Sequence, residues 1–247
     1  MQKILGQLRR AINDYKMIED GDRIAVGISG GKDSIALLTA LAQYKKFAPE
    51  KFEIIPINIS VGFDGVDENE VKACQKYIED LGLELIIEKT QIKQIVFDER
   101  KESNPCSLCS KMRRGALNTV AISHNCNKLA LGHHADDVID TFLLSLIYES
   151  RLSTFAPISY MSRSDITLIR PFIYVLEKEV KSVTKKYNMP IIHNPCPQDK
   201  HTQREEVKDL INMIENKFGY CKERMLGAIY NPDRNNLWDK YKKNLDD

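Results

Sequence analysis

The hydrophobic positions along the chain follow two periods, one typical of amphipathic helices and one typical of buried strands. Apolar residues near the N-terminus recur every three or four positions among charges, so residues 1–20 are expected to hold a helix. A short apolar run over residues 23–28 then predicts a strand. A glycine-rich turn and a second helical pattern follow this strand, which gives a strand-loop-helix unit.

The alternation of strand and helix continues through the middle of the chain. Apolar, β-branched runs predict strands and amphipathic patterns predict helices, namely strands 54–59, 83–87 and 128–131 and helices 68–81, 110–123 and 137–148. Strands separated by helices of this length form parallel sheets, and right-handed crossovers place helices on both faces. The pattern therefore predicts an α/β fold with a doubly wound parallel sheet.

The periodicity is weaker beyond residue 148. Residues 158–170 fit a hairpin or an extended loop, residues 177–187 fit a lysine-rich helix, and residues from 202 onward fit further helices. The chain has no internal repeat and no evident linker. We expect an N-terminal helix at 1–20, a central domain at 21–200 and a helical C-terminal extension at 201–247.

Composition adds limits on location and partner. Hydrophobic residues make up 43% of the chain and charged residues 29%, and no apolar stretch reaches the roughly 20 residues of a membrane span. We expect a cytoplasmic protein without membrane contact, in which six cysteines are thiols or metal ligands rather than disulfides. The formal net charge of +1 lacks the strongly basic balance typical of nucleic-acid binding, so RNA would need a local basic patch.

A glycine-rich hexapeptide joins the strand at 23–28 to the next helix. It consists of Ser29, Gly30, Gly31, Lys32, Asp33 and Ser34. Unpaired helix N–H groups favour phosphate at this position, the glycines allow its close approach, and the lysine supplies a cation. The spacing fits neither the Walker loop nor the dinucleotide fingerprint. The loop predicts triphosphate chemistry. The structural alternative is a glycine turn with a solvent-exposed lysine and no ligand.

A second polar turn follows the strand at 128–131 and is expected at the same edge of the sheet. It consists of Gly132, His133, His134, Ala135, Asp136 and Asp137. Ligands of doubly wound sheets bind at the carboxyl ends of the strands. Adjacent carboxylates would repel a triphosphate unless Mg²⁺ intervened, so Asp136 or Asp137 is a candidate metal ligand. The bland alternative is that one aspartate caps the following helix.

Three of the cysteines lie in patterns suited to metal or sulfur chemistry. Cys106 and Cys109 form a C-x-x-C at the start of the helix that contains Arg113 and Arg114, where helix N–H groups and cations favour thiolates. The tripeptide Asn-Pro-Cys that ends at Cys106 recurs at Cys196. Each proline breaks regular structure, so that the thiol projects from a turn. Cys196 is therefore the natural third ligand.

The residues alone leave three chemistries open for this trio. His193 could complete a structural zinc site of the Cys₃His type. The C-x-x-C could act as a redox dithiol, which would leave the third cysteine unexplained. Three thiolates on a 4Fe-4S cluster would leave one iron open to sulfide or substrate. The other cysteines, Cys74, Cys126 and Cys221, are expected to be structural.

Taken together, these segments resemble the TtcA family, the tRNA 2-thiocytidine synthetases. The likeness rests on the hexapeptide at 29–34, on Cys106 to Cys109 with the following Arg113-Arg114-Gly115, on residues 131–137 and on Pro195-Cys196. The resemblance implies the PP-loop ATP pyrophosphatase fold, of the adenine nucleotide alpha hydrolase-like type. It also implies that ATP adenylates the 2-oxo group of an anticodon-loop cytidine, which is then replaced by sulfur through a 4Fe-4S cluster.

The chain departs from the family pattern in two places. No second cysteine follows Cys196 closely, and Glu149-Ser150 stand where the family has two glycines. The implied cofactors are ATP, Mg²⁺ and the cluster, and the implied partners are tRNA, a sulfur donor such as a cysteine desulfurase, and a second copy of the chain in a homodimer.

The resemblance also suggests roles for individual residues. Lys32 and Asp137 are expected to be catalytic, and Cys106, Cys109 and Cys196 to hold the cluster. The nucleotide site is expected to contain Ser29, Gly30, Gly31, Lys32, Asp33, Ser34, Asn58, Gly132, His133 and Asp136. Two rival functions remain open, a lysidine-synthetase-like tRNA-modifying enzyme with a structural zinc and a non-catalytic ATP or iron-sulfur sensor.

Overall fold

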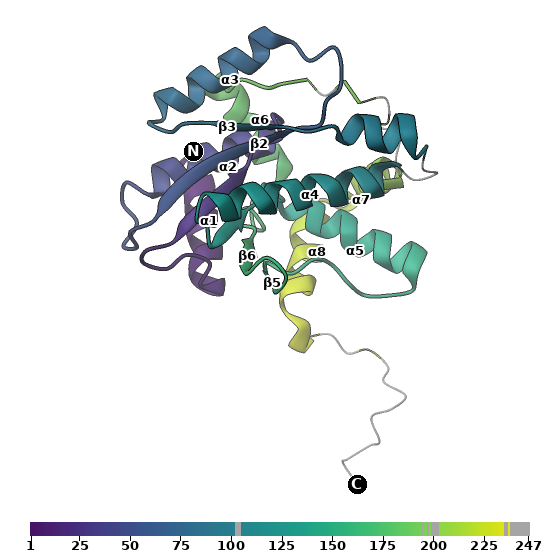
Figure 1. Ribbon diagram of the computed structural model, residues 1–247. Helices are drawn as coiled ribbons and strands as arrows, with labels where there is room; N and C mark the ends of the chain where they lie inside the picture. Colours follow the sequence, from purple (N-terminus) through teal and green to yellow (C-terminus); the bar gives the residue numbers. More distant parts are fainter. Residues whose placement is uncertain (102–104, 194, 197, 199–202, 235–236, 238–247) are drawn as a thin grey trace. The chain divides into compact units, whose positions relative to one another are not determined.

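The computed structural model describes residues 1–101, 105–193, 195–196, 198, 203–234 and 237 (Figure 1). Its elements in chain order are α1 (Gln2–Tyr15), β1 (Arg23–Gly27), α2 (Lys32–Tyr44), β2 (Glu53–Ser60), α3 (Glu68–Asp80), β3 (Ile86–Lys89), the π-helix η1 (Gln94–Glu99), α4 (Pro105–Ser123), β4 (Lys128–Ala130), α5 (Ala135–Glu149), β5 (Ile158–Met161), β6 (Ile166–Ile169), α6 (Glu177–Lys186), α7 (Gln203–Phe218), α8 (Cys221–Tyr230) and the 3-10 turn η2 (Pro232–Arg234).

The strands form one six-stranded sheet in the order β3-β2-β1-β4-β6-β5. All neighbouring pairs are parallel except β5 and β6, which pair antiparallel as a hairpin at the edge. This hairpin resolves the open alternative for residues 158–170. The strand order reverses direction between β1 and β4, so the loops after these two strands border the crevice in which such sheets bind ligands.

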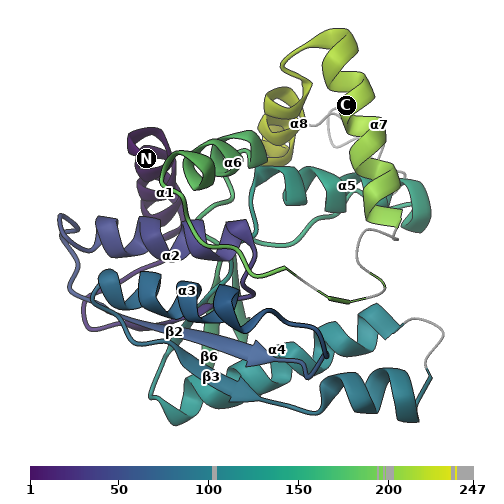
Figure 2. The ribbon, with the colours of Figure 1, turned by 90° about the horizontal axis from the view of Figure 1, so that it is seen from above.

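Helices cover both faces of the sheet. In Figure 2, α1, α2 and α6 lie on one side of the strands and α4 lies on the other. The middle of β1 is fully enclosed, with Ile24, Ala25 and Val26 each 0% exposed. Strands buried on both faces have continuous apolar sequences, and for this reason they could be predicted from the sequence. The predicted doubly wound α/β fold is thus confirmed.

Several boundaries differ from the sequence prediction for local reasons. The third strand begins at Ile86 rather than at residue 83, because the residues before it form the C-terminal cap of α3. Gly82 takes a positive φ of 78°, and the Leu83 N–H donates to Ile78 O. Helix α4 begins five residues earlier than predicted, at Pro105, a residue favoured in a first helical turn. The π-helix η1 was not predicted at all.

Contacts divide the chain into two compact units. The first contains Met1–Asp137 and Phe155–Thr202, and the second contains Val138–Thr154 and Gln203–Asp247. The second unit has its own small core around Ile139, Val207 and Ile211. The sheet and every candidate site residue belong to the first unit. No helix within the described residues combines the length and apolar character that a membrane crossing requires.

Candidate functional site

The phosphate loop is held open by its own hydrogen bonds. Ser34 Oγ accepts from the Ser29 N–H at 3.2 Å and donates to Gly31 O at 2.8 Å. Ser29 Oγ accepts from the Gly31 N–H at 3.3 Å. Gly30 has a φ of 85°, a conformation that favours glycine. Helix α2 begins directly afterwards at Lys32, so the loop is shaped before any phosphate binds and its helix N–H groups point at the ligand position.

The turn after β4 packs against this loop, as the strand order requires. A Cβ atom on Gly132 would lie 3.0 Å from both the carbonyl carbon and oxygen of Asp33 and 3.2 Å from Ser34 N. Any side chain at Gly132 would therefore push the start of α2 away. The two polar turns that the sequence placed at one edge of the sheet are in direct contact.

Lys32 lies between two carboxylates. Its Nζ is 2.9 Å from Glu177 Oε1 and 3.1 Å from Asp33 Oδ2. Burial lowers the pKa of Lys32, but Asp33 and Glu177 outweigh burial and hold the pKa above its ordinary value. For Glu177, burial raises the pKa, yet hydrogen bonds from Lys32 and Lys181 bring it down to about 2. The lysine is thus charged and pre-positioned beside the loop by an acid that the sequence did not single out.

This network predicts acid-dependent stability. Because the pKa of Glu177 falls from 4.5 to about 2 on folding, its ionised form adds stability above about pH 4.5, and this contribution is lost as the pH falls towards 2. We expect Glu177→Gln to remove about 1 kcal/mol of the difference in unfolding free energy between pH 6 and pH 3, after discounting for solvent screening. Urea unfolding at both pH values measures it. The exposed Glu84→Gln is the control, and an unchanged difference in Glu177→Gln would contradict the network.

The aspartates of the second turn have structural partners. Asp137 Oδ2 accepts from the His134 N–H at 2.9 Å, and His134 Nδ1 accepts from the Asp137 N–H at 3.4 Å, a reciprocal arrangement like a capping box at the start of α5. Asp136 Oδ2 accepts from the Glu177 N–H at 2.6 Å and so caps α6. The alternative of an aspartate that caps the following helix holds for Asp137. A metal role for either residue stays a prediction.

Asp33 has an acceptor that nothing else uses. Within the described residues, its buried Oδ1 has no hydrogen-bond partner, and His134 Nε2 lies 3.6 Å from it. Buried polar atoms are normally satisfied, so an orphaned carboxylate oxygen at the phosphate loop fits a cation or water that arrives with a ligand.

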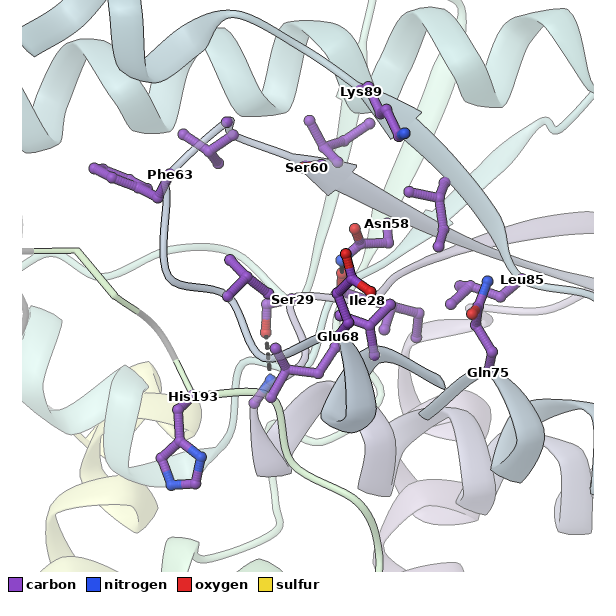
Figure 3. A pocket seen from close by; sticks show the side chains of 18 of the residues that line it. Ile28, Ser29, Asn58, Ser60, Phe63, Glu68, Gln75, Leu85, Lys89 and His193 are labelled. Atoms are coloured by element: carbon purple, nitrogen blue, oxygen red, sulfur yellow. Dashed lines mark hydrogen bonds between the residues drawn. The ribbon is translucent and has the colours of Figure 1, made fainter. Parts of the chain in front are cut away.

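A cavity of about 760 Å³ opens beside the phosphate loop (Figure 3). Ser29 and Gly31 form its loop side, and Asn58 comes from the neighbouring strand β2. Asn58 Nδ2 donates to Ile28 O at 2.7 Å, which ties β2 to the start of the loop. The rest of the wall is mixed, with apolar side chains such as Phe63 and Leu85 beside polar or charged ones such as Glu68 and Lys89. A phosphate end formed by the loop and a body with apolar surface and a few polar groups suit a nucleotide.

The segment before Cys196 is bound directly to the phosphate loop. Ile192 N–H donates to Gly30 O at 2.9 Å. His193 Nδ1 lies 2.5 Å from Glu70 Oε1 on α3, and the His193 N–H donates to Glu70 Oε2 at 2.8 Å. These bonds lower the pKa of Glu70, the backbone bond most and the side-chain bond next. His193, the candidate fourth zinc ligand, is thus already engaged through one ring nitrogen.

The three candidate cysteines lie in one neighbourhood of the first unit. Cys106 is exposed, and Cys109 and Cys196 are half-buried. Burial, the largest cause, raises the pKa of the Cys109 thiol, Arg113 opposes it, and the nearby Cys196 and Cys106 reinforce it. Among the described residues, no three His, Cys, Asp or Glu side chains are arranged to hold a metal ion. The three thiols are near one another, but among the described residues they are not arranged to share a single metal ion.

A second cavity, of about 420 Å³, is lined by both the phosphate loop and one of the three thiols, Cys109. Its wall contains Ser29 from the phosphate loop, Cys109 and Arg114 from α4, His133 from the second turn, and Arg170 after β6. Nucleotide loop and thiol therefore face a common space. Sequence reasoning missed Arg170, Glu177 and Glu70. Arg170 follows strand β6 at the carboxyl edge of the sheet, where ligands bind. The sequence left residues 158–170 open between a hairpin and a loop, so this position could not be recognised.

The strand order, the preformed loop and the crevice between β1 and β4 define a PP-loop protein, and the PP-loop domain family matches residues 2–214. The tRNA-cytidine(32) 2-sulfurtransferase of Geotalea daltonii is 37% identical over 242 residues, covering 97% of this chain and 95% of that protein. The enzyme of the same name from Geotalea uraniireducens is 36% identical over 241 residues, covering 96% and 94%. The chain belongs to the tRNA-cytidine(32) 2-sulfurtransferase family, TtcA, as the sequence motifs indicated.

Solved structures agree with this assignment. The U34-tRNA thiolase NcsA from Methanococcus maripaludis, solved with its 4Fe-4S cluster, superposes with a TM-score of 0.76 at 25% identity, covering 97% of this chain and 80% of that one. An NH3-dependent NAD synthetase from Campylobacter jejuni gives a TM-score of 0.51 at 17% identity over 93% of this chain and 91% of that one. The second likeness concerns the fold alone.

Proposed function

We propose that this chain is an ATP-dependent tRNA sulfurtransferase that replaces the 2-oxo group of a cytidine with sulfur. The observation that carries the proposal is the second cavity, whose wall holds both Ser29 and Cys109. An activated base in this space would lie near both the nucleotide loop and the thiol of Cys109. The relatives support the substrate, because their names place the reaction on cytidine 32 of tRNA.

The first step activates the oxygen that must leave. A pyrimidine carbonyl oxygen is a poor leaving group, so the cytidine O2 attacks the α-phosphorus of ATP and pyrophosphate departs as the bond between the α and β phosphates breaks. Lys32 and the N–H groups at the start of α2 stabilise the charge that develops on pyrophosphate. Asp33, through its unpartnered Oδ1, is the carboxylate best suited to a Mg²⁺ ion. Asp137 is proposed to position metal or substrate, as predicted from the sequence.

The second step exchanges oxygen for sulfur. We assign Cys106, Cys109 and Cys196 as holders of a 4Fe-4S cluster, because a set of three thiols suits iron-sulfur ligation and NcsA was solved with such a cluster. Held by three cysteines, the cluster would leave one iron free to present sulfur. A carbon-sulfur bond forms at C2 while the bond to the adenylated oxygen breaks, and AMP leaves with that oxygen. Arg113, beside Cys109, partly offsets the burial that raises the pKa of that thiol.

The remaining partners are inferred from the resemblance alone. A cysteine desulfurase is the proposed sulfur donor, a homodimer the proposed assembly, and the cytoplasm the proposed location. Light scattering of the purified chain measures the assembly directly.

The test is tRNA thiolation by the anaerobically purified chain. We expect about four irons per chain and, with ATP, Mg²⁺, sulfide and unmodified tRNA, one 2-thiocytidine per AMP and pyrophosphate released. Nucleoside mass spectrometry and nucleotide chromatography measure these products. A colourless zinc protein that attaches an amine to tRNA would favour the lysidine-synthetase-like rival. ATP binding without AMP release in the presence of tRNA would favour the sensor.

A further inference from the structure

Three arginines border the second cavity, and none of the described residues that line it is an acid. Arg113 and Arg114 come from α4 and Arg170 follows β6, and among the described lining residues there is no aspartate or glutamate. Within the described part of the chain, none of the three forms a salt bridge with a carboxylate. The space between loop and thiols is therefore cationic.

Arg170 is the strongest sign that a ligand supplies the missing charge. It is 8% exposed, and its guanidinium is fixed by Ala156 O at 2.5 Å, by His133 Nδ1 at 3.3 Å and by the Phe155 ring, whose centroid is 4.8 Å away. Ser159 Oγ lies 3.5 Å from the same guanidinium, and none of these four partners is a carboxylate. A buried charge without a counter-charge is costly, so a site that keeps one is built for an anion. Arg114 lies close enough to influence it electrostatically.

The anion is not accounted for by the phosphates of ATP. Those phosphates belong at the hexapeptide, where Lys32 and the first N–H groups of α2 face them. Of that hexapeptide only Ser29 lines the second cavity, whereas Ser29 and Gly31 line the first. Arg113 borders both cavities, but Arg114 and Arg170 border only the second. Arg114 and Arg170 are therefore placed to bind a molecule that enters the second cavity, between the nucleotide loop and Cys109.

We propose that Arg114 and Arg170 bind a backbone phosphate of the RNA at the nucleotide being modified. The inference rests on the proposed function, because that function places the target base in this cavity. A flipped base carries its own phosphodiesters with it, and the planar fork of arginine matches two phosphate oxygens at once. Arg114 and Arg170 would thus set the depth to which the base enters, and with it the distance of C2 from the sulfur.

The first test compares RNA and ATP affinity in two variants of α4. Arg114→Gln removes one member of the pair at an exposed position, and Lys111→Gln on the same helix is the matched control, exposed and outside both cavities. We expect Arg114→Gln to weaken tRNA binding about tenfold and to reduce the slope of log affinity against log salt by roughly 0.7 to 0.9. Its ATP affinity, and both affinities of Lys111→Gln, should stay within about twofold of the parent. Fluorescence anisotropy on the full chain measures them.

The second test locates the phosphate. An anticodon stem-loop RNA with a neutral methylphosphonate beside the target cytidine should bind the parent protein about tenfold more weakly, with no further loss in Arg114→Gln. Additive losses, or an unchanged tRNA affinity in Arg114→Gln, would overturn the proposal. A fall in ATP affinity with tRNA affinity unchanged would also overturn it and assign the pair to the nucleotide. These binding measurements need no turnover, so a chain that binds as expected but does not thiolate would refute the proposed function alone.

Discussion

Replacement of Cys196 by alanine is expected to abolish tRNA thiolation while ATP affinity stays within about twofold of the parent. The thiol lies near Cys109, whereas the phosphate loop is shaped by Ser29 and Ser34 through bonds that do not involve Cys196. Loss of one of three proposed cluster ligands should also lower the iron content of the anaerobically purified chain. Nucleoside mass spectrometry, iron analysis and ATP titration measure the three quantities separately.

The matched control for this variant is Cys126→Ala. Cys126 is buried with 5% exposure beside β4, and its removal should cost about 1 kcal/mol of stability without changing iron content. If the Cys196→Ala protein keeps its full iron content and still thiolates tRNA, Cys196 is not a cluster ligand. Loss of ATP binding in the same variant would instead indicate that the segment around Ile192, which donates to Gly30 O, shapes the nucleotide loop.

The sequence predicted the parts of the site that are local. The hexapeptide at 29–34 carries its own geometry, because its glycines and serines determine the turn and the following residues start a helix. The strand at 128–131 is a short buried run, so the turn that begins at Gly132 could be placed at the same edge without knowledge of its contacts. Periodicity, propensity and connection rules suffice for features of this kind.

The sequence did not predict partners that come from distant segments. Glu177 is the first residue of a lysine-rich helix whose sequence pattern indicates a solvent-exposed face. Its side chain nevertheless forms a salt bridge with Lys32. Asp136 was expected either to cap its own helix or to bind metal, and the metal role stays a prediction; the cap it forms is on α6 rather than on its own helix. The first contact exists because α6 packs beside α2, and the second because the start of α6 lies next to the start of α5. Side-chain pairs across such a packing depend on the relative placement of two helices, and a single sequence does not encode it in a readable pattern.

Replacement of Lys32 by alanine is expected to slow tRNA-dependent release of AMP and pyrophosphate by about 10²- to 10³-fold, the usual effect of losing a charged group that stabilises a transition state. The loss has two physical causes. The cation that faces the leaving pyrophosphate is gone, and Glu177 and Asp33, which lie 2.9 Å and 3.1 Å from Nζ in the parent, now face the phosphates without Lys32 to balance their charge. Rapid-quench measurement of AMP formation gives the rate.

Two further variants separate these causes. Lys181→Ala removes the other lysine that pairs with Glu177, on a side chain that is 61% exposed, and should change the rate by less than about twofold. Glu177→Gln combined with Lys32→Ala removes the neighbouring anion as well, so it should recover roughly tenfold of the lost rate if repulsion contributes about 1.4 kcal/mol. Equal rates in the single and double variants would leave only the missing cation as the cause. A Lys32→Ala enzyme as fast as the parent would exclude the lysine from catalysis, since no other described cation contacts both Asp33 and Glu177.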